Sequence, residues 1–211
     1  MKDFANIMRT RHQSKKTWTP AVGMIDISNH RFSFSLANEK FGLRIFLAVI
    51  TSLFLLLMIS YQIRMKLSDW DSLPFPGLLW INTAVLILSC IGFQWAKIAA
   101  NQNNITRVKI TLLGGGLFTW LFLFGQMLVW KQLNNMGFYL QTNPANSFFY
   151  LMTALHGLHL LGGLIVWCKT SIQLFRDKKI GDLSLSIELL TIYWHFLLAV
   201  WLVMFTMMQL K

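Results

Sequence analysis

Five long apolar segments constrain this 211-residue sequence more than any other feature. They lie at residues 43–63, 78–100, 110–133, 148–172 and 187–209. About 20 residues of helix cross the roughly 30 Å hydrocarbon core of a bilayer, so each segment is long enough to span a membrane. Backbone polar groups in lipid must be satisfied within the segment, which favours helices here. The sequence therefore predicts an all-α integral membrane protein built as a bundle of five transmembrane helices.

The composition excludes two other classes. Hydrophobic residues make up 55% of the chain and charged residues only 13%, which leaves too little polar surface for a soluble domain of this size. The net charge of +11 invites a nucleic-acid interpretation. However, the basic residues cluster between the apolar segments rather than along one stripe, so contact with lipid headgroups explains them better. Cys90 and Cys168 lie inside apolar segments without the spacing of a metal site or disulfide, and we interpret both as small membrane residues.

The basic residues also predict the domain organisation and the orientation. Residues 1–42 hold seven of them and no apolar core of signal-peptide length, so we expect a polar cytoplasmic extension, mostly loop, before a membrane domain at 43–211. With the amino terminus inside, 15 basic residues fall on the cytoplasmic side and 4 on the other. The positive-inside rule therefore predicts a cytoplasmic amino terminus and, after five spans, a carboxyl terminus outside.

Polar side chains within the last two apolar segments are the first candidates for a site. His156 and His159 lie one helical turn apart, and Glu188 and His195 are seven residues apart on one face of the next helix. Imidazoles in hydrocarbon need partners. We therefore expect the three histidines to face the bundle interior, with Glu188 hydrogen-bonded or ion-paired nearby.

Three roles are open for these histidines. They could bind haem iron, take part in a proton or substrate pathway, or join helices structurally. A spacing of three residues does not present ligands to both faces of a porphyrin, and no matching second pair is present. The structural role is therefore the preferred interpretation.

Other residues predict helix packing. Gly92, Ala96 and Ala100 recur every four positions, which makes a stripe of small residues that lets a neighbouring helix approach closely. Gly157 and Gly163 lie beside the histidines and favour the same close approach. Thr119, Gln126 and Trp130 share one helix face, and Gln126 requires a hydrogen-bond partner from another helix of the bundle or from a second subunit.

Four motifs, on four different segments and in the right order, resemble a known family. They are Ser147-Phe148-Phe149 with Thr153, His156-Gly157 and His159; Glu188 with Tyr193-Trp194-His195-Phe196; residues 73–95, including Trp80-Ile81-Asn82 and Gln94-Trp95; and Gly125-Gln126 with Trp130. The pattern resembles subunit III of the haem-copper respiratory oxidases, the cytochrome c and quinol oxidases, in its five-helix bacterial form.

The resemblance implies an accessory subunit without activity of its own. Haem and copper are expected in partner subunits, and this chain is expected to hold no metal or cofactor. Subunit I would be the main contact and subunit II or further small subunits additional ones, in the bacterial cytoplasmic membrane and its lipids, without nucleic acid. The role implied is to stabilise subunit I and its proton uptake. The expected buried polar or structural residues are Asn82, Gln126, Trp130, His156, His159, Glu188, Trp194 and His195; the expected helix-packing residues are Gly92, Ala96, Ala100, Gly157 and Gly163.

The sequence departs from the family at three positions, and two alternatives remain. Ile50, Val129 and Leu198 stand where the family often has carboxylates, so no role that depends on those groups is transferred. One alternative is the accessory protein of nitric oxide reductases, in the same superfamily. The other is a small secondary transporter that couples to protons through Glu188 and the histidines, for which we expect helices broken near the membrane midplane.

Overall fold

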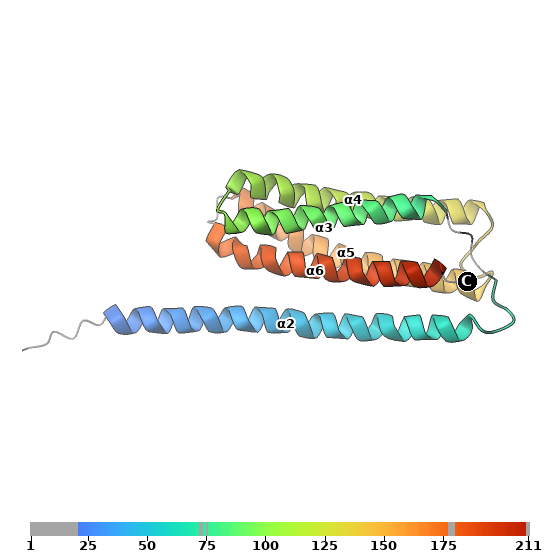
Figure 1. Ribbon diagram of the computed structural model, residues 1–211, viewed down its shortest axis with the longest axis horizontal. Helices are drawn as coiled ribbons and strands as arrows, with labels where there is room; N and C mark the ends of the chain where they lie inside the picture. Colours follow the sequence, from blue (N-terminus) through green and yellow to red (C-terminus); the bar gives the residue numbers. More distant parts are fainter. Residues whose placement is uncertain (1–20, 72–73, 75, 177–179, 210–211) are drawn as a thin grey trace, which may run out of the picture. The chain divides into compact units, whose positions relative to one another are not determined.

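The described part of the computed structural model consists of five helices (Figure 1). It describes the backbone of residues 21–71, 74, 76–176 and 180–209, and the side chains of 38–71, 74, 76–176 and 183–209. The chain divides into two compact units, 1–41 and 42–211. The helices are α2 (Ala21–Arg64), α3 (Leu78–Asn101), α4 (Ile105–Asn135), α5 (Pro144–Phe175) and α6 (Ile180–Gln209).

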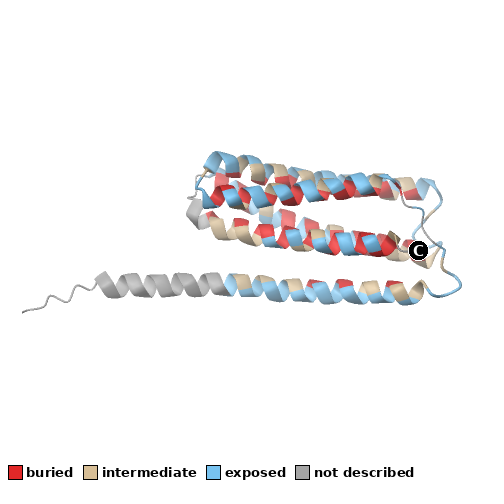
Figure 2. Ribbon diagram, viewed as in Figure 1, coloured by how far each residue is buried: buried red, intermediate tan, exposed pale blue. Residues whose placement is uncertain are grey.

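Four of the helices form a closed bundle. α3 packs against α4 and α6, and α5 completes the ring by packing against the same two helices. In Figure 2 buried and exposed residues alternate along α3 and α6, as expected for helices that turn one side toward their neighbours. All five helices are long and apolar enough to cross a membrane. The predicted five-span helical architecture is confirmed in these respects.

Local signals explain where the bundle helices begin. Asn104 caps α4 by accepting a hydrogen bond from the Arg107 backbone N–H at 3.1 Å, and Asn143 caps α5 in the same way from Ala145 at 2.9 Å. Pro144 follows as the first residue of α5, where its missing N–H is no disadvantage. Between α3 and α4 the chain reverses in three residues, and Asn103 adopts a left-handed conformation with φ of 53° that this side chain tolerates.

The helices extend further than the apolar segments. α4 begins at Ile105 rather than 110, α5 at Pro144 rather than 148, and α6 at Ile180 rather than 187. Hydropathy detects only the part of a helix that fits in hydrocarbon, whereas capping determines its true start. The expectation that 1–42 is mostly loop is wrong for its second half, because α2 already begins at Ala21. Residues 1–20 and the basic residues Lys178, Lys179 and Lys211 lie outside the described part.

The described helices run without interruption across their spans. The broken helices expected of the transporter alternative are therefore absent from residues 38–64, 78–101, 105–135, 144–175 and 183–209. One end of the four-helix bundle, which contains the turn between α3 and α4, carries Lys97, Arg107, Lys109, Lys169 and Arg176. We call it the basic end.

The membrane part of α2 packs on α5 and α6 through large aromatic side chains. Phe46 stacks on Tyr193 of α6 with ring centroids 6.2 Å apart, and Phe54 lies 5.5 Å from the ring of His159. Tyr61 contacts Phe148 of α5 edge-on at 6.0 Å. Only 11% of the apolar window of this span is buried, compared with 33% to 44% in the other four spans. α2 is therefore the helix least enclosed by its own chain.

Candidate functional site: the polar interior of the bundle

Three tryptophan–threonine pairs link the bundle helices across the interior. The indole N–H of Trp194 donates to Thr119 Oγ1 at 2.9 Å, that of Trp201 to Thr83 Oγ1 at 3.0 Å, and that of Trp130 to Thr153 Oγ1 at 3.2 Å. The pairs join α6 to α4, α6 to α3 and α4 to α5, respectively. An indole N–H without an acceptor in hydrocarbon costs several kcal/mol, so each pair fixes the rotation of two helices against each other.

Each threonine in these pairs is used twice. Its hydroxyl donates to a carbonyl four residues earlier in its own helix, at 2.8 Å for Thr83, 3.0 Å for Thr119 and 2.7 Å for Thr153. The hydroxyl oxygen is then free to accept from the indole of the neighbouring helix. The Thr119 pair is extended by Ser89 of α3, whose Oγ lies 2.7 Å from Thr119 Oγ1 and 2.8 Å from the Gly115 carbonyl oxygen.

Glycines on α4 provide the space for this interior. A Cβ at Gly116 would lie 2.1 Å from the ring of Trp167, whose indole N–H donates to the Leu112 carbonyl at 2.8 Å. A Cβ at Gly92 of α3 would come within 2.9 Å of the Gly115 backbone. Ala96 and Ala100 are both buried. Close approach of α3, α4 and α5 therefore depends on positions without a side chain.

The glycines near the histidines differ from one another. A Cβ at Gly163 would lie 2.7 Å from the ring of Tyr193 and 2.9 Å from that of Trp194, so this position needs glycine. At Gly157 the nearest atom would be a Leu123 methyl group at 3.6 Å, which is ordinary contact distance. Gly157 therefore has room for a Cβ, and a helix-packing role for it stays a prediction.

An amide pair lies in the interior between α3 and α4. Asn82 Nδ2 donates to Gln126 Oε1 at 3.2 Å, and both side chains are buried. Gly125 allows this arrangement, because a Cβ there would lie 2.3 Å from Asn82 Oδ1. The partner that Gln126 requires is thus found within the bundle. The Nε2 atom of Gln126 is nevertheless buried without a hydrogen-bond partner in the described part of the chain.

His156 is fully buried among aromatic rings. Its ring centroid lies 5.1 Å from that of Trp201, 5.9 Å from that of Phe122 and 6.5 Å from that of Phe54. Neither ring nitrogen has a hydrogen-bond partner among the described residues. A haem on either nitrogen would have to displace these rings, so the residues present do not fit haem ligation by His156.

His159 and His195 have the same local hydrogen bond. The Nδ1 of each lies 2.7 Å from the carbonyl oxygen four residues earlier, Leu155 O and Thr191 O. A carbonyl oxygen only accepts, so Nδ1 carries the proton, and Nε2 of the neutral ring is left as an acceptor. The two side chains differ in exposure, because His159 is half-buried and His195 is exposed.

The exposed position of His195 corrects a prediction. It was expected to face the bundle interior, but Trp194 occupies that position, with none of its surface exposed. Consecutive residues of a helix point about 100° apart, so both side chains cannot face inward. Glu188 is half-buried and pairs with Lys97 of α3, with Nζ and Oε1 3.8 Å apart. The face shared by Glu188 and His195 is therefore an outer face of α6.

The sequence alone did not identify several interior residues. The structure also explains two of the three apolar residues that stand where the family often has carboxylates. Trp167, Trp201, Thr83 and Thr153 were not predicted as site residues, although the N–H of a buried tryptophan usually finds an acceptor. Ile50 and Val129 are buried among hydrophobic residues of the core, whereas Leu198 is half-buried. No cluster of three or more His, Cys, Asp or Glu side chains that could hold a metal ion occurs among the described residues.

The fold and its interior define a multi-pass helical membrane protein in which polar side chains join one helix to another. A sequence model described as cytochrome c oxidase subunit III matches residues 69–210. The chain is 30% identical to a protein of Synechocystis named cytochrome c oxidase subunit 3, over 82% of this chain and 75% of that protein. It is 28% identical to cytochrome bo(3) ubiquinol oxidase subunit 3 of Buchnera aphidicola, over 84% of this chain and 88% of that protein. The chain belongs to the subunit III family of haem-copper oxidases.

A third relative matches only part of this chain. The chain is 33% identical to a probable cytochrome c oxidase subunit 3 of Mycobacterium tuberculosis, over 59% of this chain and 61% of that protein. The matched region of the family begins at residue 69 and contains α3 to α6. These are the four helices that form the closed bundle and hold the three tryptophan–threonine pairs.

Proposed function

We propose that this chain is the accessory subunit III of a bacterial haem-copper terminal oxidase in the cytoplasmic membrane. It forms part of a complex that reduces oxygen at haem and copper held by other subunits. Its own role is to pack against subunit I, with subunit II and small subunits as further neighbours, and to stabilise turnover and proton uptake there. Residues 1–42 lie in the cytoplasm and the carboxyl terminus lies outside.

One observation carries this proposal. The indole N–H groups of Trp130, Trp194 and Trp201 each donate a hydrogen bond to a threonine of another helix in the same bundle. A bundle whose polar groups are engaged in this way is suited to act as a rigid body. The tight packing at Gly92 and Gly116 supports the same role. The names of the relatives favour an oxidase over the nitric oxide reductase alternative.

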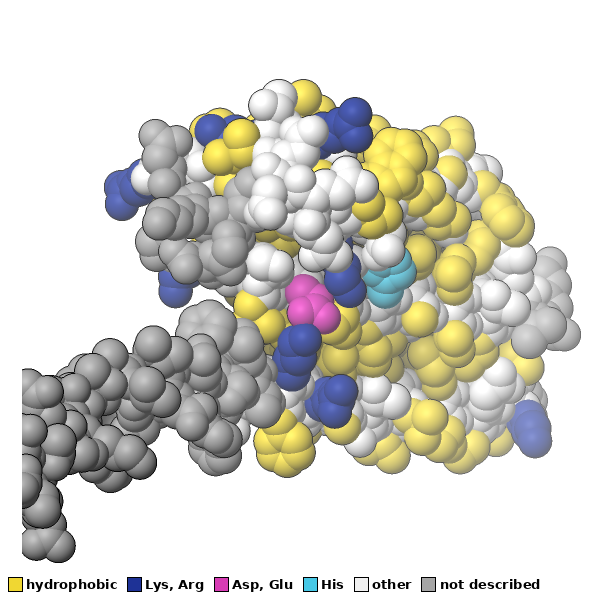
Figure 3. All heavy atoms as spheres, turned by 60° about the vertical axis from the view of Figure 1, so that its left-hand side comes forward, with side chains coloured by type: hydrophobic (Ala, Val, Ile, Leu, Met, Phe, Trp, Pro, Cys, Tyr) yellow, Lys and Arg dark blue, Asp and Glu magenta, His cyan; other side chains and the backbone are white. Residues whose placement is uncertain are grey.

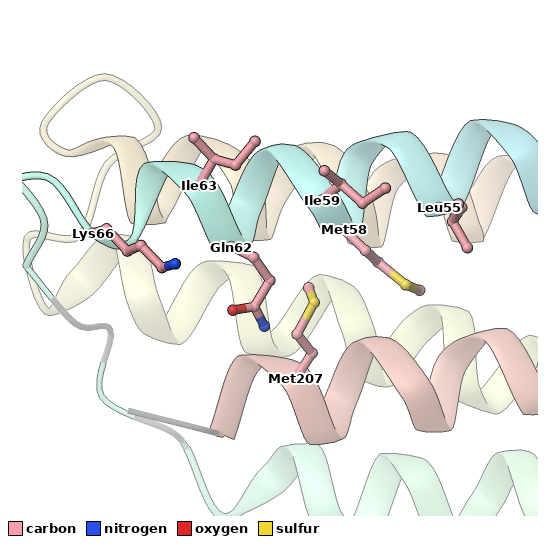
Figure 4. Close-up of a pocket in the computed structure, with 7 residues that line it drawn as sticks. All are labelled: Leu55, Met58, Ile59, Gln62, Ile63, Lys66 and Met207. Carbon is pink, nitrogen blue, oxygen red and sulfur yellow. The ribbon is translucent and has the colours of Figure 1, made fainter.

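Membrane lipids are a second class of partner in this proposal. A groove of about 340 Å³ between α2 and α6 is lined by Leu55, Met58, Ile59, Gln62, Ile63, Lys66 and Met207 (Figure 4). Gln62 and Met207 point toward each other across it, and Lys66 lies at one end. Apolar walls with an amide and an ammonium group at one end suit an acyl chain below a phosphate headgroup.

The test is to delete the gene and purify the remaining oxidase in mild detergent. We expect haem absorption per complex to be nearly unchanged, while the rate of oxygen reduction declines during sustained turnover. Complementation with the intact chain should restore the sustained rate. A complex that assembles correctly but lacks its haem signal would contradict the division of labour, as would a purified chain that copurifies with no oxidase subunit.

A further inference from the structure

Gln126 of α4 and His156 of α5 hold polar atoms inside the bundle that have no hydrogen-bond partner among the described residues. These atoms are Nε2 of Gln126 and both ring nitrogens of His156. His156 has none of its surface exposed, and Gln126 only 5%. By contrast, Figure 3 shows a histidine side chain at the surface among hydrophobic ones. About 90% or more of buried polar groups in proteins have a partner, so these buried atoms need an explanation.

The orientation of His156 differs from that of the two other histidines that the structure describes. His159 and His195 each bring Nδ1 within 2.7 Å of the carbonyl oxygen four residues earlier in their own helix. His156 makes no such bond, and its ring lies instead beside the rings of Phe122 of α4 and Trp201 of α6. The imidazole of His156 is therefore turned into the bundle rather than back along α5.

Contacts on both sides place Gln126 and His156 at the same depth of the bundle. Phe122 lies one turn before Gln126 on α4, and its ring centroid is 5.9 Å from that of His156. Trp130 lies one turn after Gln126, and its indole N–H donates to Thr153, three residues before His156. The turn of α5 that contains Thr153 and His156 therefore lies opposite Gln126.

A second route of contacts, through α6 and α3, leads to the same depth. The ring centroid of Trp201 lies 5.1 Å from that of His156, and the indole N–H of Trp201 donates to Thr83. Next to Thr83 on α3 is Asn82, whose Nδ2 donates to Gln126 Oε1 at 3.2 Å. Side chains from all four bundle helices therefore surround Gln126 and His156.

The unpaired atoms of these two side chains are chemically complementary. Nε2 of Gln126 is an amide donor, and a neutral imidazole carries one N–H donor and one acceptor nitrogen. The rings of Phe54 and Phe122 stand at 69° and 82° to the imidazole of His156. An aromatic ring accepts an N–H only weakly and offers no strong donor, so the acceptor nitrogen of His156 stays unpaired. A donor on α4 and an acceptor on α5 thus lie at the same depth without bonding directly to each other.

We propose that an ordered water molecule binds between Gln126 and His156. The water accepts a hydrogen bond from Gln126 Nε2 and donates one to the acceptor nitrogen of His156. Buried waters in proteins typically make two to four such bonds. The sequence of bonds from Asn82 through Gln126 and the water to His156 then joins α3, α4 and α5 across the interior.

Burial and depth favour water over any other occupant. Acyl chains of lipid offer neither donor nor acceptor at this depth. A side chain of another subunit cannot reach a histidine that has no exposed surface. The site belongs to the interior of this chain, so the inference goes beyond the proposed function and does not rest on it.

The direct test is a cryo-electron microscopy map of the full chain, in the complex with which it purifies, at a resolution that shows ordered waters. We expect a density peak within about 2.6–3.2 Å of both Gln126 Nε2 and one ring nitrogen of His156. A map without this peak would overturn the proposal, as would a peak bonded to only one of the two side chains. A direct hydrogen bond between Gln126 and His156 would overturn it as well.

A double-mutant cycle on the purified full chain is a second test. Gln126→Leu and His156→Leu each remove one side of the water site and leave the other side unpaired, whereas the combined variant removes both. We expect the combined variant to lower the thermal midpoint by less than the sum of the two single shifts. Strictly additive shifts would overturn the proposal.

The matched control for the cycle is Thr191→Val combined with His156→Leu. The Thr191 hydroxyl also bonds to another helix, donating to the Phe93 carbonyl at 3.2 Å. Thr191 lies ten residues before Trp201 on α6, which is about 15 Å along the helix axis, so it is remote from the water site. We expect the shifts of this control pair to add. Equal departures from additivity in both pairs would show that the first coupling is not specific to Gln126 and His156, and would overturn the proposal.

Discussion

At the scale of single residues, the pairing of a buried indole with a threonine hydroxyl recurs at three places in the bundle. The geometry assigns each hydroxyl two tasks, one within its own helix and one across to a tryptophan. Removing the hydroxyl while keeping the shape of the side chain isolates the second task, because the helix itself tolerates a β-branched apolar residue.

We predict that Thr119→Val destabilises the bundle by about 1–3 kcal/mol, because it leaves the Trp194 N–H buried without an acceptor. The measurement is the thermal midpoint of the purified oxidase or of the isolated chain, followed by tryptophan fluorescence. Thr206→Val is the matched control, since Thr206 is exposed and bonds only to its own helix. An equal loss in both variants would show that the interhelical bond contributes nothing.

His156 gives the opposite prediction, because its ring nitrogens have no hydrogen-bond partner to lose among the residues that the structure describes. Replacing it with an apolar side chain of similar volume, His156→Leu, removes the desolvation penalty of an imidazole among Phe54, Phe122 and Trp201. We predict a free energy of unfolding within about 1 kcal/mol of the original value, and oxygen reduction by the oxidase unchanged. A stable variant with much slower proton uptake would assign His156 to a proton pathway instead.

At the scale of the helices, hydropathy predicted the spans but not which residues face the interior, and both results have a common physical cause. The number and order of the spans depend on local composition, so the five segments sufficed to predict them. The choice between neighbouring residues as interior or exterior depends on rotation about the helix axis, which a segment apolar on all sides leaves undetermined. Trp194 and His195 illustrate this. From the sequence, either residue could face the interior, and only the positions of α3 and α4 beside α6 decide that Trp194 does.

The close approach of α4 and α5 can be tested at Gly116, with Gly114 on the same turn of α4 as the control. A Cβ at Gly116 would lie 2.1 Å from the Trp167 ring, whereas a Cβ at Gly114 would meet nothing within 4 Å. We expect Gly116→Ala to force α4 and α5 apart and to lower the yield of folded protein severalfold, in line with the 1–3 kcal/mol typical of overpacking. Gly114→Ala should match or exceed the original stability, because alanine favours helix. Size-exclusion chromatography in detergent measures both.

At the scale of the whole molecule, the chain divides into units 1–41 and 42–211, and we expect the bundle to fold without the segment before it. The matched family region begins only at residue 69, which is consistent with this independence. Removing residues 1–37 also removes six basic residues from the cytoplasmic side of the proposed orientation. Nine would remain on that side against four on the other, so the charge bias persists.

We therefore predict that the chain lacking 1–37 inserts with its five spans in the proposed orientation. Carboxyl-terminal fusions measure this, because alkaline phosphatase is active only outside the cytoplasm and green fluorescent protein fluoresces only when it folds inside. We expect an active phosphatase fusion and a dark fluorescent fusion, in both the full chain and the shortened one. A fluorescent fusion of the full chain would reverse the proposed orientation. A reversal in the shortened chain alone would instead mean that the first 37 residues, and not the loops of the bundle, set the topology.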